Sequence, residues 1–168
     1  KIFKLKNPPP WHFEQLNLGL NYRMNDIAAA LGISQLKSLK HFLKSRNKIA
    51  KFYDKKLYSY KLFLPKKDKT IKNAFHLYPI RTKGKNKRIT RLRLFNYLRK
   101  KNIFVNIHYI PVHYHPYYKK IGFRKNDYPK MKSYYDSVLS LPIYPGLKET
   151  KISKIINYIN KILNEKKP

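Results

Sequence analysis

The sequence predicts an α+β fold in which a small sheet is covered by helices on one side. Three patterns indicate it: a long apolar stripe at residues 25–58, strand-like stretches at residues 74–81 and 103–107, and a row of isoleucines at residues 148–164. Apolar residues three and four apart share one face of a helix, whereas strand residues alternate between two faces. The 168 residues suffice for one domain with its own core, or for a small domain plus docking helices.

The first helix is predicted to begin at Asn25 and Asp26, after an irregular stretch that contains Pro8, Pro9 and Pro10. Asparagine is a favourable N-cap, and an acidic side chain suits the positive end of a helix. The apolar stripe then continues to residue 58, either unbroken or with one break near residues 38–40. Little else in the chain could cover so long a helix, so we expect it to dock on a part of the protein outside this sequence.

The remaining elements follow from shorter patterns. Residues 84–86 are predicted to form a turn and residues 90–100 a helix, which Asn102 closes in the left-handed conformation. Residues 127–139 are predicted to form a helix, and residues 141–144 a short edge strand. Pro111 and Pro116 are expected to exclude regular structure from the loop at residues 108–118.

The charge is extreme, with 39 Lys and Arg against 8 Asp and Glu and a formal net charge of +31. One interpretation is a protein that binds nucleic acid or a membrane surface. The other is compositional drift in an A/T-rich genome, which we favour because the lysines are scattered along the chain and greatly outnumber the arginines. No apolar run is long enough to span a membrane. The lack of cysteine fits a cytoplasmic protein.

The loop at residues 108–118 is the densest group of chemically versatile side chains, with three histidines and four tyrosines. It has three interpretations. His108, His113 and His115 could bind a metal, although no carboxylate lies nearby to orient the rings. The rings could also simply pack in the core. We favour a wall of a ligand site, because Tyr and His offer flat faces to a base or sugar and polar tips to phosphate and hydroxyl oxygens.

A second candidate precedes the first helix at residues 19–26. The amide of Asn21, the guanidinium of Arg23 and the free N–H groups of the helix end could face a phosphate. The alternative is a plain helix cap with Arg23 in solvent. No Ser-His-Asp set is apparent. The five glycines form neither a phosphate loop nor a dinucleotide fingerprint.

Residues 21–36 read Asn-Tyr-Arg-Met-Asn-Asp-Ile-Ala-Ala-Ala-Leu-Gly-Ile-Ser-Gln-Leu, and this segment resembles the DegT/DnrJ/StrS family of nucleotide-sugar aminotransferases. Further matches lie at residues 75–78, 108–113, 116–118 and 139–145, so the resemblance covers nearly the whole chain in order. Within the family, Trp11, Glu14, Gln15 and the 108–118 loop are most similar to UDP-4-amino-4,6-dideoxy-N-acetyl-beta-L-altrosamine transaminases of pseudaminic acid synthesis.

The resemblance implies the C-terminal part of a fold-type I enzyme that uses pyridoxal 5'-phosphate (PLP). Residues 61–168 would form its small domain, a small antiparallel sheet with helices. Residues 1–60 would contribute the end of the large domain and the helices that dock on it. The family's Schiff-base lysine precedes the Asn-Tyr-Arg motif. We therefore expect no catalytic residue in this chain, and neither Lys4 nor Lys6 is taken for that lysine. The chain alone is expected to be inactive.

The resemblance also implies partners and site residues. The expected substrates are a UDP-linked keto-deoxysugar and an amino donor, glutamate in this family, and the expected assembly is a homodimer with shared active sites. Asn21 and Arg23 are expected to contact the cofactor, and no metal is expected. The residues expected to contact the substrate are Tyr22, His108, Tyr109, His113 and Tyr117. Two rival hypotheses are a basic module that stacks nucleic acid on the aromatic loop, and an inactive truncated remnant.

Overall fold

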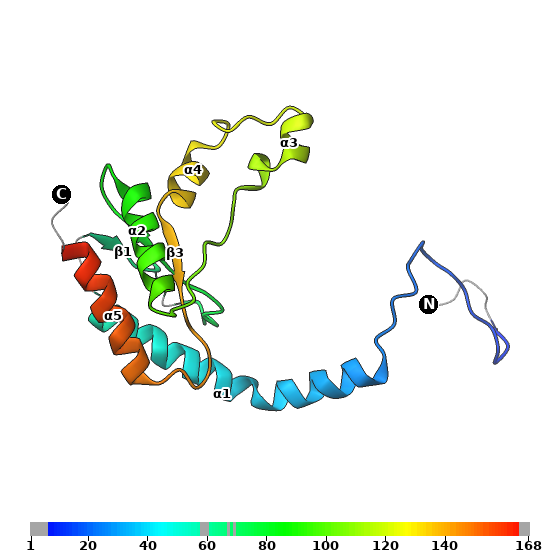
Figure 1. Cartoon of the computed structure of the whole chain (residues 1–168). Coiled ribbons are helices and arrows are strands. Elements are labelled where there is room, and N and C mark those ends of the chain that lie inside the picture. The colour runs from blue at the N-terminus through cyan, green and yellow to red at the C-terminus, as the bar shows by residue number, and fades with distance from the viewer. Residues whose placement is uncertain (1–6, 58–60, 67, 69, 165–168) are drawn as a thin grey trace. The chain divides into compact units, whose positions relative to one another are not determined.

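The computed structural model describes residues 7–57, 61–66, 68 and 70–164. It divides into two compact units, Lys1–Lys37 and Ser38–Pro168. Figure 1 shows the elements and labels most of them. They are α1 (Asp26–Lys56), β1 (Leu62–Phe63), β2 (Tyr78–Thr82), α2 (Lys87–Lys100), the 3-10 turn η1 (Val112–Tyr114), α3 (Pro116–Lys120), α4 (Pro129–Tyr135), β3 (Val138–Leu141) and α5 (Glu149–Asn164).

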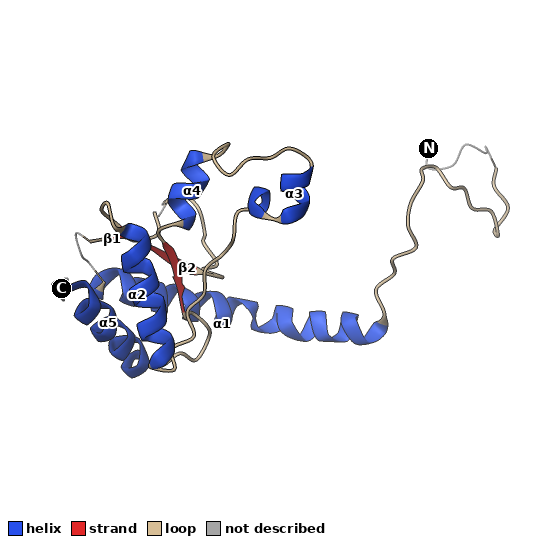
Figure 2. Cartoon of the chain, turned by 45° about the horizontal axis from the view of Figure 1, so that its top comes forward, coloured by secondary structure: helices blue, strands red, loops and turns tan. Residues whose placement is uncertain are grey.

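The second unit is built on a three-stranded antiparallel sheet in the order β1-β2-β3. Leu62 pairs with Thr82, and Tyr78 pairs with Leu141 at the other side of β2. Helix α2 packs against β2, β3 and α5, and Figure 2 shows α2 and α5 side by side over the sheet. The predicted α+β fold with a small antiparallel sheet is therefore confirmed.

Helix α1 confirms the predicted long first helix, and it is unbroken through residues 38–40. The N-cap is also confirmed, since the backbone N–H of Ala28 donates to Oδ1 of Asn25 at 2.8 Å. Only the last part of the helix is buried, at Ile49, Ala50 and Tyr53. Residue 58, the predicted end of the helix, and the two lysines at positions 4 and 6 lie outside the described residues.

The last part of α1 is fixed to the sheet by polar contacts as well as by packing. The ring of Tyr53 stacks on Tyr78 with centroids 4.8 Å apart, and its hydroxyl donates to the carbonyl of Pro142 at 2.9 Å. The hydroxyl of Tyr78 donates to Oδ1 of Asp54 at 2.7 Å. Burial raises the pKa of both tyrosines well above the ordinary value.

Arg46 also joins α1 to two distant segments. Its Nη1 donates to the carbonyl oxygens of Phe75, His76 and Ile143 at 3.1, 3.3 and 2.9 Å. These carbonyls belong to the segment before β2 and the segment after β3, so one guanidinium satisfies backbone groups that no strand pairs. Hydrogen bonds to a charged donor are stronger than those to a neutral one. Arg46 therefore has a structural role here.

Helix α5 confirms the prediction made from its isoleucines. The helix begins at Glu149, one residue after the predicted start. All five residues of the predicted stripe are buried: Ile152, Ile155, Ile156, Ile159 and Ile162. Asn102 likewise closes α2 as predicted, with a φ of 58°. No helix in the described part of the chain is long and apolar enough to cross a bilayer.

Several strand predictions were wrong in position. Residues 103–107 form no strand and contribute only an isolated bridge between Asn106 and Ser140. The predicted strand at residues 74–81 begins only at Tyr78, because Phe75 adopts a φ of 45° that breaks the extended conformation. The short strand β1 was not predicted, because two residues carry no periodicity.

The boundary between α4 and β3 was also misplaced. Helix α4 ends at Tyr135 and not at residue 139. The residues that follow form β3 at Val138–Leu141, where an edge strand had been predicted at residues 141–144. Pro142 cannot donate a ladder hydrogen bond, which explains why the strand ends before it and not after it.

The loop at residues 108–118 contains regular structure, contrary to prediction. It includes η1 and the first turn of α3. Pro116 is the first residue of α3, a position where a helix does not need the missing N–H. The proline therefore starts a helix here instead of preventing one.

Candidate functional site

The aromatic segment at residues 108–118 leaves the sheet at β3 and carries η1 and α3, which lie away from the sheet in Figures 1 and 2. His108 fixes its first residue to the sheet, since Nδ1 lies 2.9 Å from Oγ of Ser140 in β3. Ser140 is buried and was not predicted as part of the site. The signal that could have found it is its place in the Leu-Ser-Leu-Pro segment that matches the family.

Tyr109 and Tyr117 present their rings to the surface, with 71% and 67% of each residue exposed. Tyr117 lies in the first turn of α3 and packs edge-on against Tyr118, with ring centroids 5.4 Å apart. Tyr118 in turn packs against Phe123 at 6.0 Å. Two exposed rings supported by further rings suit contact with a flat or sugar-bearing ligand.

His113 is placed differently from its neighbours. It is only 7% exposed, and its ring packs edge-on against Tyr114 and Tyr128 at centroid distances of 4.6 and 4.8 Å. Tyr114 packs in turn against Tyr135 at the end of α4. His113 therefore supports the segment from inside. Its expected contact with substrate stays a prediction.

The metal interpretation finds no support in this geometry. Of the three histidines, His108 contacts Ser140, His113 is enclosed by tyrosines and His115 is exposed. Within residues 7–57, 61–66, 68 and 70–164, no group of three or more His, Asp or Glu side chains could hold a metal ion.

The second predicted group belongs to the first unit. Asn21, Tyr22 and Arg23 are exposed and precede the N-cap of α1. Together with Gln15, Asn17, Gly19 and Leu20 they line an open hollow of about 460 Å³. The amide and guanidinium donors suit an anion such as a phosphate. The structure describes this group and the aromatic segment in separate units, so whether they meet in one site stays a prediction.

Residues 5–160 match the model of the DegT/DnrJ/EryC1/StrS aminotransferase family. The chain belongs to this family. Its members are PLP-dependent aminotransferases of nucleotide-sugar biosynthesis, so the family prediction made from residues 21–36 is confirmed.

Three proteins illustrate how similar this chain is to known aminotransferases and related proteins. The spore coat polysaccharide biosynthesis protein SpsC of Bacillus subtilis is 34% identical over 91% of this chain and 40% of its own length. The UDP-4-amino-4,6-dideoxy-N-acetyl-beta-L-altrosamine transaminase of Campylobacter jejuni is 36% identical over 86% of this chain and 39% of its own length. A putative sugar aminotransferase of Streptococcus pneumoniae, solved in its PLP form, superimposes with a TM-score of 0.81 at 27% identity, covering 90% of this chain and 39% of that one. The chain thus spans about 40% of the length of its relatives.

Proposed function

We propose that the chain is the C-terminal part of an aminotransferase that places an amino group on a UDP-linked keto-deoxysugar, as in pseudaminic acid synthesis. The observation that carries the proposal is the 36% identity to the Campylobacter jejuni transaminase, whose name specifies a UDP-linked amino sugar. Glutamate as donor, a homodimer with shared active sites and a cytoplasmic location belong to the same proposal.

The proposal assigns different roles to the two parts of the chain. Residues 61–168 would be the small domain, and residues 1–60 would end the large domain and join the two. The exposed apolar residues in the first half of α1 support this assignment, since Ile27 is 84% and Leu36 68% exposed. Apolar residues at helical spacing normally face a partner. Here the proposed partner is the large domain.

The residues of the first unit fit the cofactor's phosphate. Asn21 and Arg23 would hold it, because an amide N–H and a guanidinium both donate hydrogen bonds to phosphate oxygens and the hollow around them is open to solvent. When bound, PLP carries the amino group between donor and acceptor. No residue of this chain is proposed as the Schiff-base lysine. The resemblance places that lysine before the Asn-Tyr-Arg segment.

The proposed substrate residues are Tyr22 from the first unit and His108, Tyr109, His113 and Tyr117 from the second. Tyr109 and Tyr117 would offer ring faces to the base or sugar and hydroxyls to its oxygens. His108, fixed by Ser140, would present its other ring nitrogen to the ligand. His113 would act from beneath, by holding Tyr114 and Tyr128 in place.

The test is an assay of the longest reading frame that contains the chain, purified with PLP. Amino transfer from glutamate to a UDP-linked 4-keto sugar is measured by mass spectrometry, with the GDP-linked sugar as comparison. We expect product only from the UDP sugar. Tyr117→Ala should lower kcat/KM by about tenfold or more, as loss of an aromatic contact does. Phe63→Ala, a change at another exposed ring, should not. Equal turnover of the GDP sugar would refute the UDP assignment.

A further inference from the structure

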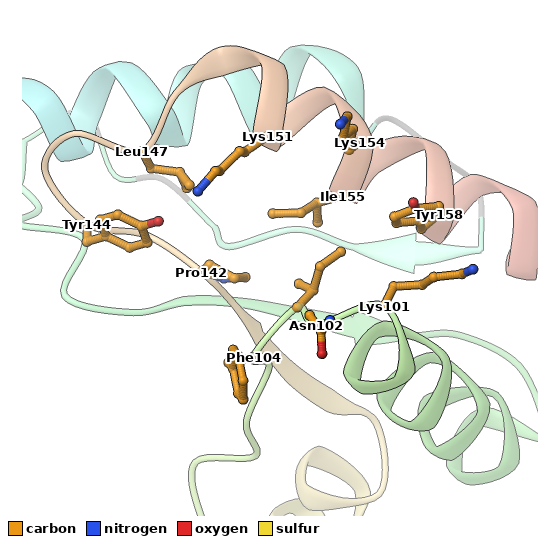
Figure 3. Close-up of a pocket in the computed structure, with 11 residues that line it drawn as sticks. Lys101, Asn102, Phe104, Pro142, Tyr144, Leu147, Lys151, Lys154, Ile155 and Tyr158 are labelled. Atoms are coloured by element: carbon orange, nitrogen blue, oxygen red, sulfur yellow. The ribbon is translucent and has the colours of Figure 1, made fainter.

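A pocket of about 620 Å³ lies between the end of α2, the segment after β3 and residues 151–158 of α5. Figure 3 shows its lining residues, which come from residues 101–104 and from the later stretch 142–158. The volume lies within the roughly 300–1,000 Å³ typical of sites for small ligands. None of the residues proposed for cofactor or substrate lines it. The pocket is therefore separate from the proposed cofactor and substrate residues.

The floor of this pocket is apolar. Leu147 and Ile155 are buried members of the core, and Pro142, the first residue after β3, lines the pocket with them. Two aromatic rings rise beside the floor: Phe104 is 75% exposed and Tyr144 is 46% exposed. An apolar floor with exposed rings at its edge favours a ligand that has a flat ring of its own.

The polar groups of the pocket are almost all hydrogen-bond donors or cations. Lys101 comes from the end of α2, and Lys151 and Lys154 come from successive turns of α5. In Figure 3 the Lys151 side chain runs from α5 into the pocket. Its nitrogen points toward the side of the pocket where the Tyr144 hydroxyl lies. The lining residues, all within the described part of the chain, include no Asp or Glu.

Lysines are frequent in this chain, so three of them alone would not distinguish this pocket from the rest of the surface. The distinguishing feature is that they surround an apolar floor with exposed rings. Nothing acidic among the lining residues neutralises them. A phosphate monoester carries about −1.5 to −2 charges at neutral pH and matches several ammonium groups better than a single carboxylate does.

We propose that this pocket binds a small phosphorylated compound with a flat ring, with the chemistry of a nucleoside monophosphate. The ring lies on the floor against Phe104 and Tyr144. The phosphate lies at the Lys151 side of the pocket, which the Tyr144 hydroxyl also faces, and Lys101 and Lys154 add positive charge elsewhere around the floor. Lys101 itself points away from the Lys151 side, and its Nζ lies 6.0 Å from the ring centroids of both Tyr97 and Tyr158.

The test is a methyl NMR titration of the whole chain with three probes: UMP, uridine and inorganic phosphate. UMP should shift the methyl signals of Ile103, Leu147 and Ile155 in a saturable way. Uridine and phosphate should each do so only at much higher concentration, because each keeps only one of the two kinds of contact. The methyls of Ile152 and Ile159, fully buried residues of the same helix that do not line the pocket, report whether the fold is intact.

Two sets of variants separate a specific site from general basicity. K101Q/K151Q/K154Q should weaken UMP binding by about tenfold or more, as loss of charged hydrogen-bond donors does. The matched control K55Q/K56Q/K161Q removes three exposed lysines that lie outside the pocket and should leave the affinity unchanged. Phe104→Ala should weaken binding of UMP without changing that of inorganic phosphate.

Three outcomes would overturn the proposal. The first is equal weakening by both triple variants, which would make the effect one of net charge. The second is a set of UMP-induced shifts that misses Ile103, Leu147 and Ile155. The third is no saturable shift at millimolar UMP in a chain whose Ile152 and Ile159 signals show it to be folded.

Discussion

Helices α1 and α5 both carry apolar residues at helical spacing, yet these residues lie in opposite environments. The stripe of α5 is buried along its whole length, whereas the first half of α1 leaves its apolar residues in solvent. The pattern predicts the helix in both cases, because local spacing decides helix formation. Burial depends instead on what packs against the helix. An apolar face that none of the described residues covers therefore indicates a docking surface, and we propose that it meets the large domain of the enzyme.

The largest effect expected from this difference comes from placing a charge on each stripe. Ile159→Asp should destabilise the second unit by about 4 kcal/mol or more, because it buries an unpaired carboxylate. Leu36→Asp should change the stability of the chain by about 0.5 kcal/mol or less, because Leu36 is exposed. Urea denaturation measures both. Equal losses would contradict the comparison.

In the longest reading frame the result for Leu36→Asp should change. If the first half of α1 docks on the large domain, the same substitution places a charge in an interface and should cost about 2 kcal/mol or more. Lys37→Asp, at the next position and also exposed, controls for the helix propensity of aspartate; it changes the net charge by two units, whereas Leu36→Asp changes it by one. A small effect of Leu36→Asp on the stability of the longer protein would contradict the proposed docking surface on the first half of α1.

A smaller effect is expected at high pH, in the buried half of α1. Burial raises the pKa of Tyr53 and Tyr78 in the folded state, whereas both ionise near 10.0 when unfolded. The folded chain therefore holds more protons than the unfolded chain above that pH, and stability should fall as pH rises past about 10. Tyr53→Phe should make the fall less steep, since phenylalanine does not titrate. An unchanged slope would mean that other groups control the alkaline unfolding.

The smallest effect is expected at the start of α1. Asn25→Ala removes the side-chain oxygen that accepts the N–H of Ala28 and should cost the helix end about 1 kcal/mol. The measurement is hydrogen exchange of the Ala28 amide, which should quicken by roughly five- to tenfold. Asn25→Asp is the control, because aspartate caps equally well. Unaltered exchange in the alanine variant would show that the cap does not hold this end of the helix.

The sequence predicted the long elements well and the short ones poorly. Helices α1 and α5 are long enough for the helical spacing of their apolar residues to be unambiguous. Asn102, which favours the left-handed conformation, correctly indicated the end of α2. The strands are two to five residues long, and their positions depend on pairing across the sheet. Residues 103–107 have strand-like composition but make only one bridge, because only Asn106 comes into register with Ser140.

The sequence could predict which residues belong to the candidate site. It could not predict how their side chains are arranged in space. The aromatic composition of residues 108–118 pointed to a ligand wall, and the family resemblance selected its members. Composition cannot indicate which rings turn inward. Tyr109 and Tyr117 face solvent, whereas His113 packs among tyrosines that come partly from outside the loop. The supporting contact from Ser140 also depends on the fold, since 32 positions separate it from His108.

We propose above that this chain forms part of a longer PLP enzyme, to which it contributes Asn21 and Arg23. The most direct measurement is PLP affinity, followed by the visible absorbance of the bound cofactor. It is made for residues 1–168 and for the longest reading frame, each with and without Asn21→Ala. We predict tight binding by the longer protein, weakened by Asn21→Ala, and no comparable binding by residues 1–168. Equally tight binding by residues 1–168, or a longer protein that does not bind PLP, would contradict the account.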